Sequence, residues 1–314
     1  MSSIAEKTMT AHTAPGVTQQ QWQFESPMIG GLVVGFDGSP ASQAALDSAA
    51  VIATEKRWPV HVVSVLPPMS SYKFELKAHQ PQSEIEDLRR QLRDASVCDA
   101  IGSDPKRAGW TRQILIGNSA EQIAKVAEKR GADLIILGRS QRRGLDRLIT
   151  GETTLQVMRC SSVPVMVVED DLMKPTTAVV AVDFGPASML AARVALELLG
   201  AEGTLYLVYV EEPIDLFPGA TISPVPQHYP GEVIVFFRRM LEGLRVPAGV
   251  VGQTVLLNGS PVSAIEEFCE RVGADLLVAG THGLSRVTSF FLGSVSTGLV
   301  RRIRIPVVIT PERA

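Results

Sequence analysis

The sequence predicts an α/β protein of two tandem doubly wound domains, each with a five-stranded parallel sheet. First, short runs of Val, Ile and Leu lack polar alternation, as expected of strands buried on both faces of a parallel sheet. Second, helical patterns separate these runs, which is typical of parallel strands joined by crossover helices. Third, the arrangement occurs twice in 314 residues, a length that suits about two domains.

The duplication is visible in the residues themselves. The segment GADLIILG at 131–138 recurs as GADLLVAG at 273–280. Further upstream, GLVVGFDGSPAS at 31–42 matches TAVVAVDFGPAS at 177–188. Self-similarity of this length indicates two copies of one structural unit.

Each copy contains five apolar runs. In the first copy they predict strands over 31–36, 60–66, 111–116, 133–138 and 164–168. In the second copy they predict strands over 178–182, 204–210, 253–257, 275–280 and 306–310. The first helix of each copy is expected to begin at Pro40 or Pro186, after Ser39 or Gly185 as the cap, because the missing proline N–H costs nothing at the first helical position.

These elements divide the chain into four parts. We expect a disordered polar tail over 1–28, a first domain over 29–170, an acidic linker over 171–176 and a second domain over 177–314. The longest difference between the copies lies between their second and third strands. There the first copy has an amphipathic helix and the second has a proline-rich loop, which either covers a site or partner surface or is a plain insertion.

Bulk composition excludes several classes of partner. The net charge of −3 and the pI near 6.0 provide no basic field for nucleic acid. No apolar stretch reaches the roughly 20 residues that cross a bilayer, so we expect no membrane association. The three cysteines form no C-x-x-C pair, which argues against a metal site or a disulfide framework and favours a reducing, cytoplasmic setting.

A glycine pattern follows the fourth strand of the second copy. Gly280, Gly283, Gly293 and Ser294 form G-x-x-G, nine residues, then G-S. Glycines let the backbone approach phosphate oxygens, and a helix that begins at Ser294 favours negative charge at its N-terminus. The alternative is that the glycines serve only a tight turn and close helix packing. Asp183, at the end of the first strand, is expected either to bind an adenine amino group or ribose hydroxyl or to cap a helix.

Several features together resemble the universal stress protein family in its tandem two-domain form. They are the Asp-Gly-Ser after the first strand, Gly117 and Gly259 after the third strands, the complete glycine pattern and the closing Val-Pro-Val or Ile-Pro-Val strand. The resemblance covers nearly all of 29–312 and implies a Rossmann-like fold and, in one branch of the family, ATP binding. It implies an ATP site at Asp183, Val210, Gly280, His282, Gly283, Gly293, Ser294, Val295 and Ser296.

The first copy departs from the glycine pattern. Gln141 stands where the second glycine is expected, and Glu152 stands at the position of Ser294. A carboxylate there would repel phosphates, so this copy is either a weakened nucleotide site or a degenerate half. Its weaker candidate residues are Asp37, Val65, Gly138, Arg139, Gly151 and Thr153.

Four arginines of the same segment admit two interpretations. They could compensate for the carboxylate, or they could form a solvated basic loop, which is favoured because charged runs usually face water. They are Arg139, Arg142, Arg143 and Arg147.

No pattern in the chain indicates an enzyme. There is no G-x-x-x-x-G-K-[ST], no G-x-S-x-G and no adenylyl-transfer signature, and we expect neither catalytic residues nor a protein-bound metal. His282 is better suited to donate to phosphate than to act as a base. The expected function is therefore a cytoplasmic, ATP-binding stress-response sensor or scaffold, with any Mg²⁺ carried by the nucleotide. The alternatives are a structural stress protein without nucleotide and a slow ATP hydrolase.

The last strands suggest how the copies associate. The segments 163–168 and 305–310 are short and apolar, and at a sheet edge such strands invite pairing with a like edge. We expect the two domains to pair through them, and a homodimer of the whole chain by analogy with the family.

Overall fold

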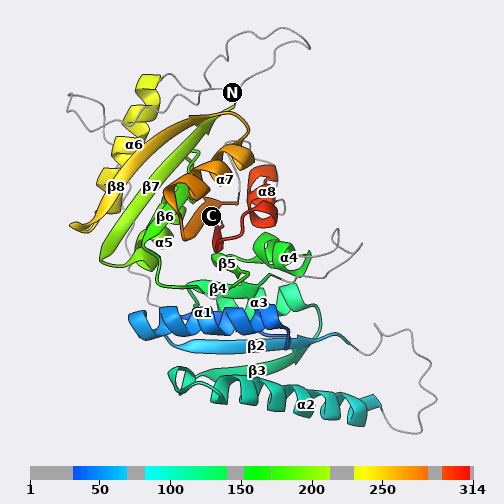
Figure 1. Ribbon diagram of the computed structural model, residues 1–314. Coiled ribbons are helices and arrows are strands. Elements are labelled where there is room, and N and C mark those ends of the chain that lie inside the picture. Colours follow the sequence, from blue (N-terminus) through cyan, green and yellow to red (C-terminus); the bar gives the residue numbers. More distant parts are fainter. Residues whose placement is uncertain are drawn as a thin grey trace, which may run out of the picture. The chain divides into compact units, whose positions relative to one another are not determined.

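The computed structural model describes residues 31–68, 82–139, 152–170, 172–212, 230–281 and 292–311. Contacts divide the chain into two compact units that meet in sequence between Met173 and Lys174. Each unit is an α/β domain (Figure 1).

The first domain contains a five-stranded parallel sheet in the order β3-β2-β1-β4-β5. Its core consists of strand residues without solvent exposure, such as Val34, Val62 and Ile136. The elements are β1 (Leu32–Gly35), α1 (Pro40–Lys56), β2 (Val60–Leu66), α2 (Gln82–Gly102), η2 (Pro105–Arg107), β3 (Thr111–Ile116), α3 (Ser119–Arg130), β4 (Leu134–Gly138), α4 (Glu152–Cys160) and β5 (Val165–Val168).

The second domain repeats this topology, with a parallel sheet in the order β10-β9-β6-β7-β8. Val180, Leu277 and Val308 form part of its fully buried core. The elements are β6 (Thr177–Ala181), α5 (Pro186–Leu199), β7 (Glu202–Glu211), α6 (Pro230–Leu244), β8 (Gly249–Asn258), α7 (Pro261–Val272), β9 (Leu276–Gly280), α8 (Ser294–Arg302) and β10 (Val307–Thr310).

Helices cover both faces of each sheet, because the chain reverses its direction of travel across the sheet after the third strand. In the first domain α1 contacts β1 and β4, and α2 contacts β2 and β3, whereas α3 contacts β1 and β2 and packs against α4 (Figure 1). Right-handed crossovers place α1 and α2 on one face and α3 and α4 on the other. The reversal lies between β1 and β4, and between β6 and β9 in the second domain. Ligands of open α/β sheets bind beyond the carboxyl ends of the strands at such a point.

The predicted fold class is confirmed, and most strands begin and end within two residues of their predicted bounds. The largest difference is β8, which starts at Gly249 rather than at 253. The predicted amphipathic helix is α2, and two leucines of its apolar stripe are exposed: Leu88 is 55% exposed and Leu92 is 64% exposed.

The predicted linker is tied to both domains. On one side Leu172 is buried, and its N–H donates to Ser48 Oγ of α1 at 2.9 Å. On the other side Thr176 and Thr177 donate their N–H groups to the Asp275 carboxylate at 2.9–3.1 Å. The pairing of the two domains through their last strands stays a prediction.

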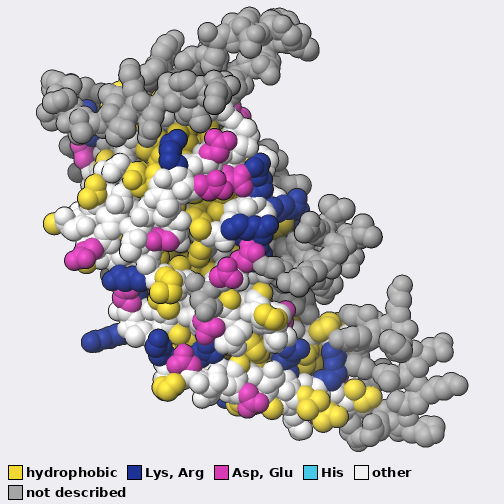
Figure 2. Space-filling model, in the orientation of Figure 1, with side chains coloured by type: hydrophobic (Ala, Val, Ile, Leu, Met, Phe, Trp, Pro, Cys, Tyr) yellow, Lys and Arg dark blue, Asp and Glu magenta, His cyan; other side chains and the backbone are white. Residues whose placement is uncertain are grey.

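Surface properties of the described residues agree with the bulk composition. On the face shown in Figure 2, Lys and Arg side chains are interspersed with Asp and Glu. None of the described helices is long and apolar enough to span a bilayer.

A buried histidine lies near the amino end of the first sheet. His61 on β2 is 4% exposed, and its Nδ1 lies 2.8 Å from Thr111 Oγ1. Burial and the nearby Arg130 guanidinium lower the pKa of His61 to about 4, although a hydrogen bond with Gln113 opposes the shift. His61 is therefore neutral at pH 7.

The free energy of unfolding is expected to fall by up to about 3 kcal/mol between pH 6.5 and pH 4 because of His61. In this range the unfolded chain binds a proton that the folded chain does not, so acid favours unfolding. Urea denaturation at several pH values would measure the slope. The His61→Gln variant, which does not titrate, should lose this part of the slope; an unchanged slope would contradict the assignment.

Candidate functional site

In the second domain, Asp183 and Val210 lie at the carboxyl ends of neighbouring strands. Asp183 follows β6 and is half-buried, and Val210 is the penultimate residue of β7. Asp183 Oδ1 accepts hydrogen bonds from the Gly185 N–H at 2.9 Å and from the Ser188 hydroxyl. This carboxylate therefore holds the turn before α5 without capping the helix itself, and one of its oxygens is committed to that turn.

Phe184, the next residue, adopts a left-handed backbone conformation with φ of 64°. Such a φ is rare for a bulky side chain and costs about 1–3 kcal/mol, and the first domain has Gly38 at this place. The Phe184 ring lies 4.9–5.2 Å from the rings of Tyr209, Phe236 and Phe237. These ring contacts hold the conformation and attach the Asp183 turn to α6.

Gly280 and its counterpart Gly138 end β9 and β4, and packing alone explains both glycines. A Cβ on Gly280 would lie 2.7 Å from Ala187 Cβ of α5. A Cβ on Gly138 would lie 2.0 Å from the Ala41 carbonyl oxygen and 2.7 Å from the Ser42 nitrogen of α1. These two glycines let the first helix of each domain approach the strand end, so the structural interpretation applies to them.

Gly138→Ala is expected to destabilise the first domain by about 3 kcal/mol, because the new methyl group would overlap backbone atoms that cannot rotate away. Gly280→Ala should cost less, because its closest contact is a methyl group. Urea denaturation would measure both. Gly231→Ala on α6, where a Cβ meets nothing within 4 Å, is the matched control and should change stability by less than about 1 kcal/mol. Equal effects at Gly138 and Gly231 would disprove the packing explanation.

The start of α8 brings together four of the predicted site residues. Gly293 is the N-cap, Ser294 is exposed, Val295 is half-buried and Ser296 is buried. The Ser296 hydroxyl donates to the Gly280 carbonyl at 2.6 Å, so it ties the helix to the strand end. The Gly293 N–H donates to the Thr281 carbonyl at 2.8 Å. The predicted residues His282 and Gly283 lie outside the described residues.

Helix capping differs between the domains. In the first domain Ser39 Oγ accepts from the Ser42 N–H, and Asn118 Oδ1 accepts from the first turn of α3. In the second domain, among the described residues, no side chain is hydrogen-bonded as the N-cap of α5, α7 or α8. The caps of these three helices are Gly185, Ser260 and Gly293. Main-chain donors at these helix starts are therefore not satisfied by a cap side chain.

The weaker candidate site residues of the first domain differ in their solvent exposure. Asp37 is exposed; desolvation opposes its ionisation, but hydrogen bonds from Ser39 and the charge of Arg93 keep the pKa of its carboxyl below the usual value. Val65 is half-buried on β2, and Thr153 is exposed in the first turn of α4. Gly151 lies outside the described residues.

Arg139 corrects the interpretation of the basic segment as a wholly solvated loop. Its side chain is 12% exposed, and its Nε lies 3.7 Å from the Glu169 carboxylate. The main-chain N–H of Arg139 donates to the Val168 carbonyl at 2.7 Å, which continues the pairing of β4 with β5 by one residue. The other three arginines, Arg142, Arg143 and Arg147, lie outside the described residues.

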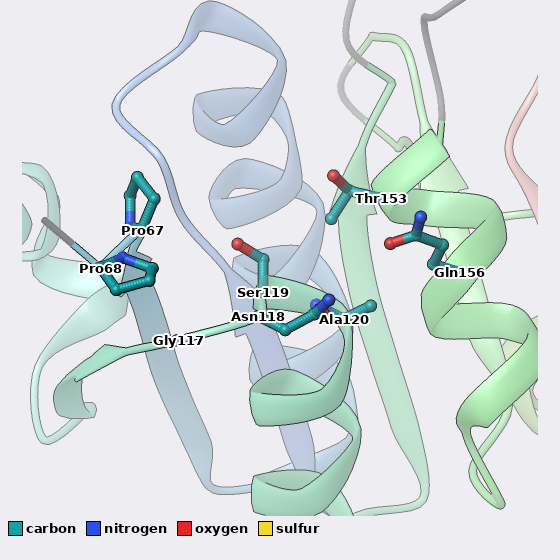
Figure 3. Close-up of a pocket in the computed structure, with 8 residues that line it drawn as sticks. All are labelled: Pro67, Pro68, Gly117, Asn118, Ser119, Ala120, Thr153 and Gln156. Carbon is teal, nitrogen blue, oxygen red and sulfur yellow. The ribbon is translucent and has the colours of Figure 1, made fainter. Parts of the chain in front are cut away.

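A pocket of about 380 Å³ opens in the first domain between the starts of α3 and α4 (Figure 3). Its other wall is the segment after β2. Of the residues predicted from the sequence only Thr153 lines it, although Gly117 was part of the pattern that indicated the family. The lining residues are Pro67, Pro68, Gly117, Asn118, Ser119, Ala120, Thr153 and Gln156.

The cysteines are free, and no group of three or more metal-ligating side chains occurs in the described part of the chain. Cys269 is buried, and burial with the nearby Glu270 raises the pKa of its thiol to about 12. Cys160 is exposed at the end of α4, with its Sγ 3.7 Å from the Ala120 carbonyl oxygen.

Comparison with known sequences identifies the same unit twice. The profile of the Universal stress protein family matches residues 28–169 and again residues 176–311. A universal stress protein of Mycobacterium tuberculosis is 27% identical over 302 residues, which cover 90% of this chain and 97% of that protein. One from Mycolicibacterium smegmatis is 26% identical over 293 residues, with coverage of 90% and 97%.

Solved structures show the same fold. A universal stress protein from Archaeoglobus fulgidus aligns with a TM-score of 0.64 at 19% identity, covering 90% of this chain and 96% of that one. A putative universal stress protein from Pseudomonas aeruginosa aligns with a TM-score of 0.54 at 15% identity, with coverage of 90% and 92%.

Proposed function

Because the chain belongs to the universal stress protein family, we propose that its second domain binds ATP and that the bound nucleotide regulates it as a stress-response sensor or scaffold. The site would lie beyond the carboxyl ends of β6, β7 and β9, where the sheet reverses its order. Any Mg²⁺ would arrive with the nucleotide.

The lack of side-chain caps at α5, α7 and α8, among the residues that the structure describes, carries this proposal. A helix N-terminus presents main-chain N–H groups and a partial positive charge, both of which favour an anion. At α8 the cap is a glycine and the next residue is the exposed Ser294, whose hydroxyl can add a donor. This start follows the segment that contains the family's glycine pattern, so it supports triphosphate binding at α8.

The adenosine would lie towards Asp183 and Val210. Gly185 and Ser188 use one oxygen of the Asp183 carboxylate, and that bonding fixes the orientation of the side chain. A carboxylate held in this way can accept from an adenine amino group or a ribose hydroxyl with its second oxygen. Binding that alters the Asp183 turn would also act on α6 through Phe184. We therefore propose that α6 transmits occupancy of the site.

Regulation rather than turnover is proposed because the described site residues serve as hydrogen-bond donors, packing residues or turn-holding groups. Ser296 is engaged with Gly280, and Asp183 with the turn before α5. A ligand acts as a regulator by binding one of two states more tightly. Cytoplasmic location and a homodimer remain part of the proposal.

Isothermal titration calorimetry of the intact chain with ATP tests the proposal. We expect one ATP per chain, bound to the second domain, with negligible phosphate release over the time of the titration. Absence of binding would reject the proposal, and many turnovers per minute would replace it with an enzyme. Two equivalent ATP molecules per chain would contradict the assignment to the second domain alone.

A further inference from the structure

The pocket of the first domain has a lining unlike that of a phosphate site. Two hydroxyl groups and two carboxamides face it, from Ser119, Thr153, Asn118 and Gln156. Two proline rings provide its apolar wall, and none of its described lining residues carries a charge. Neutral donors and acceptors beside an apolar wall suit an uncharged polar ligand, because each can pair without burying a charge.

The polar groups converge from two helices. Figure 3 shows the Ser119 side chain on α3 and the Thr153 side chain on α4 on opposite sides of one space, with Gln156 one turn further along α4. Pro67 and Pro68 close the space on the side of β2. The Arg89 guanidinium donates to the Pro67 carbonyl at 3.1 Å, which helps to hold that wall.

The helix starts around the pocket are poorly suited to phosphate. Asn118 Oδ1 already accepts from the Ala120 N–H at 2.9 Å and from the Glu121 N–H at 3.2 Å, which satisfies two main-chain donors of α3. The first residue of α4 is Glu152, an acidic residue type, where α8 has Ser294.

The corresponding contact between α7 and α8 in the second domain contains a larger side chain. Ala120 of α3 corresponds to Val262 of α7, and Gln156 of α4 corresponds to Gly298 of α8. A Cβ on Gly298 would lie only 2.7 Å from Val262 Cγ2, so the valine occupies the place next to α8. The small Ala120 therefore leaves open in the first domain the place that Val262 occupies in the second.

We infer that the pocket between α3 and α4 binds an uncharged, hydroxyl-rich ligand of nucleoside or sugar size. Its volume of about 380 Å³ lies within the range of about 300–1,000 Å³ that is usual for small-molecule sites. The hydroxyls and carboxamides pair with ligand hydroxyls or with a base edge, and the proline rings pack against the flat apolar part. The inference does not depend on ATP binding by the second domain.

Calorimetry with adenosine and with ribose on the full chain tests the inference, and two variants of the pocket assign the binding to the first domain. Ala120→Val, which copies the second domain, should raise the dissociation constant at least tenfold. Gln156→Leu, which keeps the side-chain volume but removes the amide, should raise the dissociation constant by the same factor. It provides an independent test if Ala120→Val fails to fold. Gln91→Ala, an exposed glutamine of α2 outside the lining, is the control and should leave affinity unchanged.

The outcomes separate the ligand sources. Adenosine at least tenfold tighter than ribose identifies a nucleoside site, and equal affinities identify a sugar site; both support the inference. No binding of either probe at about 10 mM, or binding that Ala120→Val and Gln156→Leu leave intact, overturns it. Failure of the wild-type chain to bind ATP would overturn the proposed function alone.

Discussion

Replacing Ser294 by glutamate is expected to weaken ATP binding at least 100-fold, the largest effect that a single change at the proposed site should have. The change gives α8 the residue type that α4 already has at its first position, Glu152, so the fold should tolerate it. Two unit charges 4 Å apart repel by about 4 kcal/mol at an effective dielectric constant of about 20. Ser294 is exposed, so screening reduces this figure, and a 100-fold loss corresponds to about 2.7 kcal/mol.

Three controls separate site repulsion from other effects. Ser294→Ala removes only a hydroxyl and should weaken binding less than tenfold. Val251→Glu adds the same charge at an exposed position near the amino end of β8 and should have no effect. Glu152→Ser should leave the ATP affinity of the chain within about twofold, because Gln141 still interrupts the glycine pattern of the first domain. If Ser294→Glu bound ATP as tightly as the wild type, the phosphates would not bind at the start of α8.

Arg107→Leu is expected to destabilise the first domain by about 3 kcal/mol. The Arg107 side chain is 2% exposed, and its guanidinium forms an ion pair with Asp47 and donates to the Ala100 carbonyl. It thereby joins η2 to α1 and α2. Breaking a buried pair costs about 3–5 kcal/mol because the partner charge is left without compensation. The lower end applies because Asp47 keeps a third of its side chain exposed.

Urea denaturation of the first domain would measure this loss, with Arg112→Leu as the control. Arg112 pairs with Asp94 at 2.7 Å, but both side chains are well exposed, so the control should cost less than about 1 kcal/mol. Asp47→Asn in the Arg107→Leu background should recover part of the stability. Equal effects of Arg107→Leu and Arg112→Leu would show that burial of the pair is unimportant.

The sequence predicted the strands well because each is an uninterrupted apolar run buried on both faces. The start of β8 was missed because Gly249 and Gly252 interrupt the apolar pattern, and a strand that has only one neighbour in its own domain's sheet can keep polar and glycine residues exposed. The exposure of Leu88 and Leu92 on α2 was missed for a different reason. Periodicity identifies an apolar face of a helix but does not show what covers that face.

The candidate sites were harder to predict because their key contacts join residues that are distant in sequence. Gly138 and Gly280 matched a phosphate pattern, yet their surroundings show close helix approach. The pocket of the first domain depends on residues of two helices, and only an alignment of the copies at Ala120 and Val262 could have indicated it. No pattern in the sequence indicated that Arg107 is buried, because a single arginine in a polar segment is expected to face solvent.

The position of Cys160 gives this chain a built-in chemical reporter. Cys160 is an exposed residue, burial of its sulfur raises the pKa of its thiol, and the sulfur lies 3.7 Å from the carbonyl oxygen of Ala120, which lines the pocket of the first domain. Cys269 should stay silent towards thiol reagents near pH 8, because a thiol with a pKa of about 12 holds almost no thiolate there. The rate of alkylation at Cys160, followed by peptide mass spectrometry, can therefore register events at the pocket in the unmodified wild-type protein.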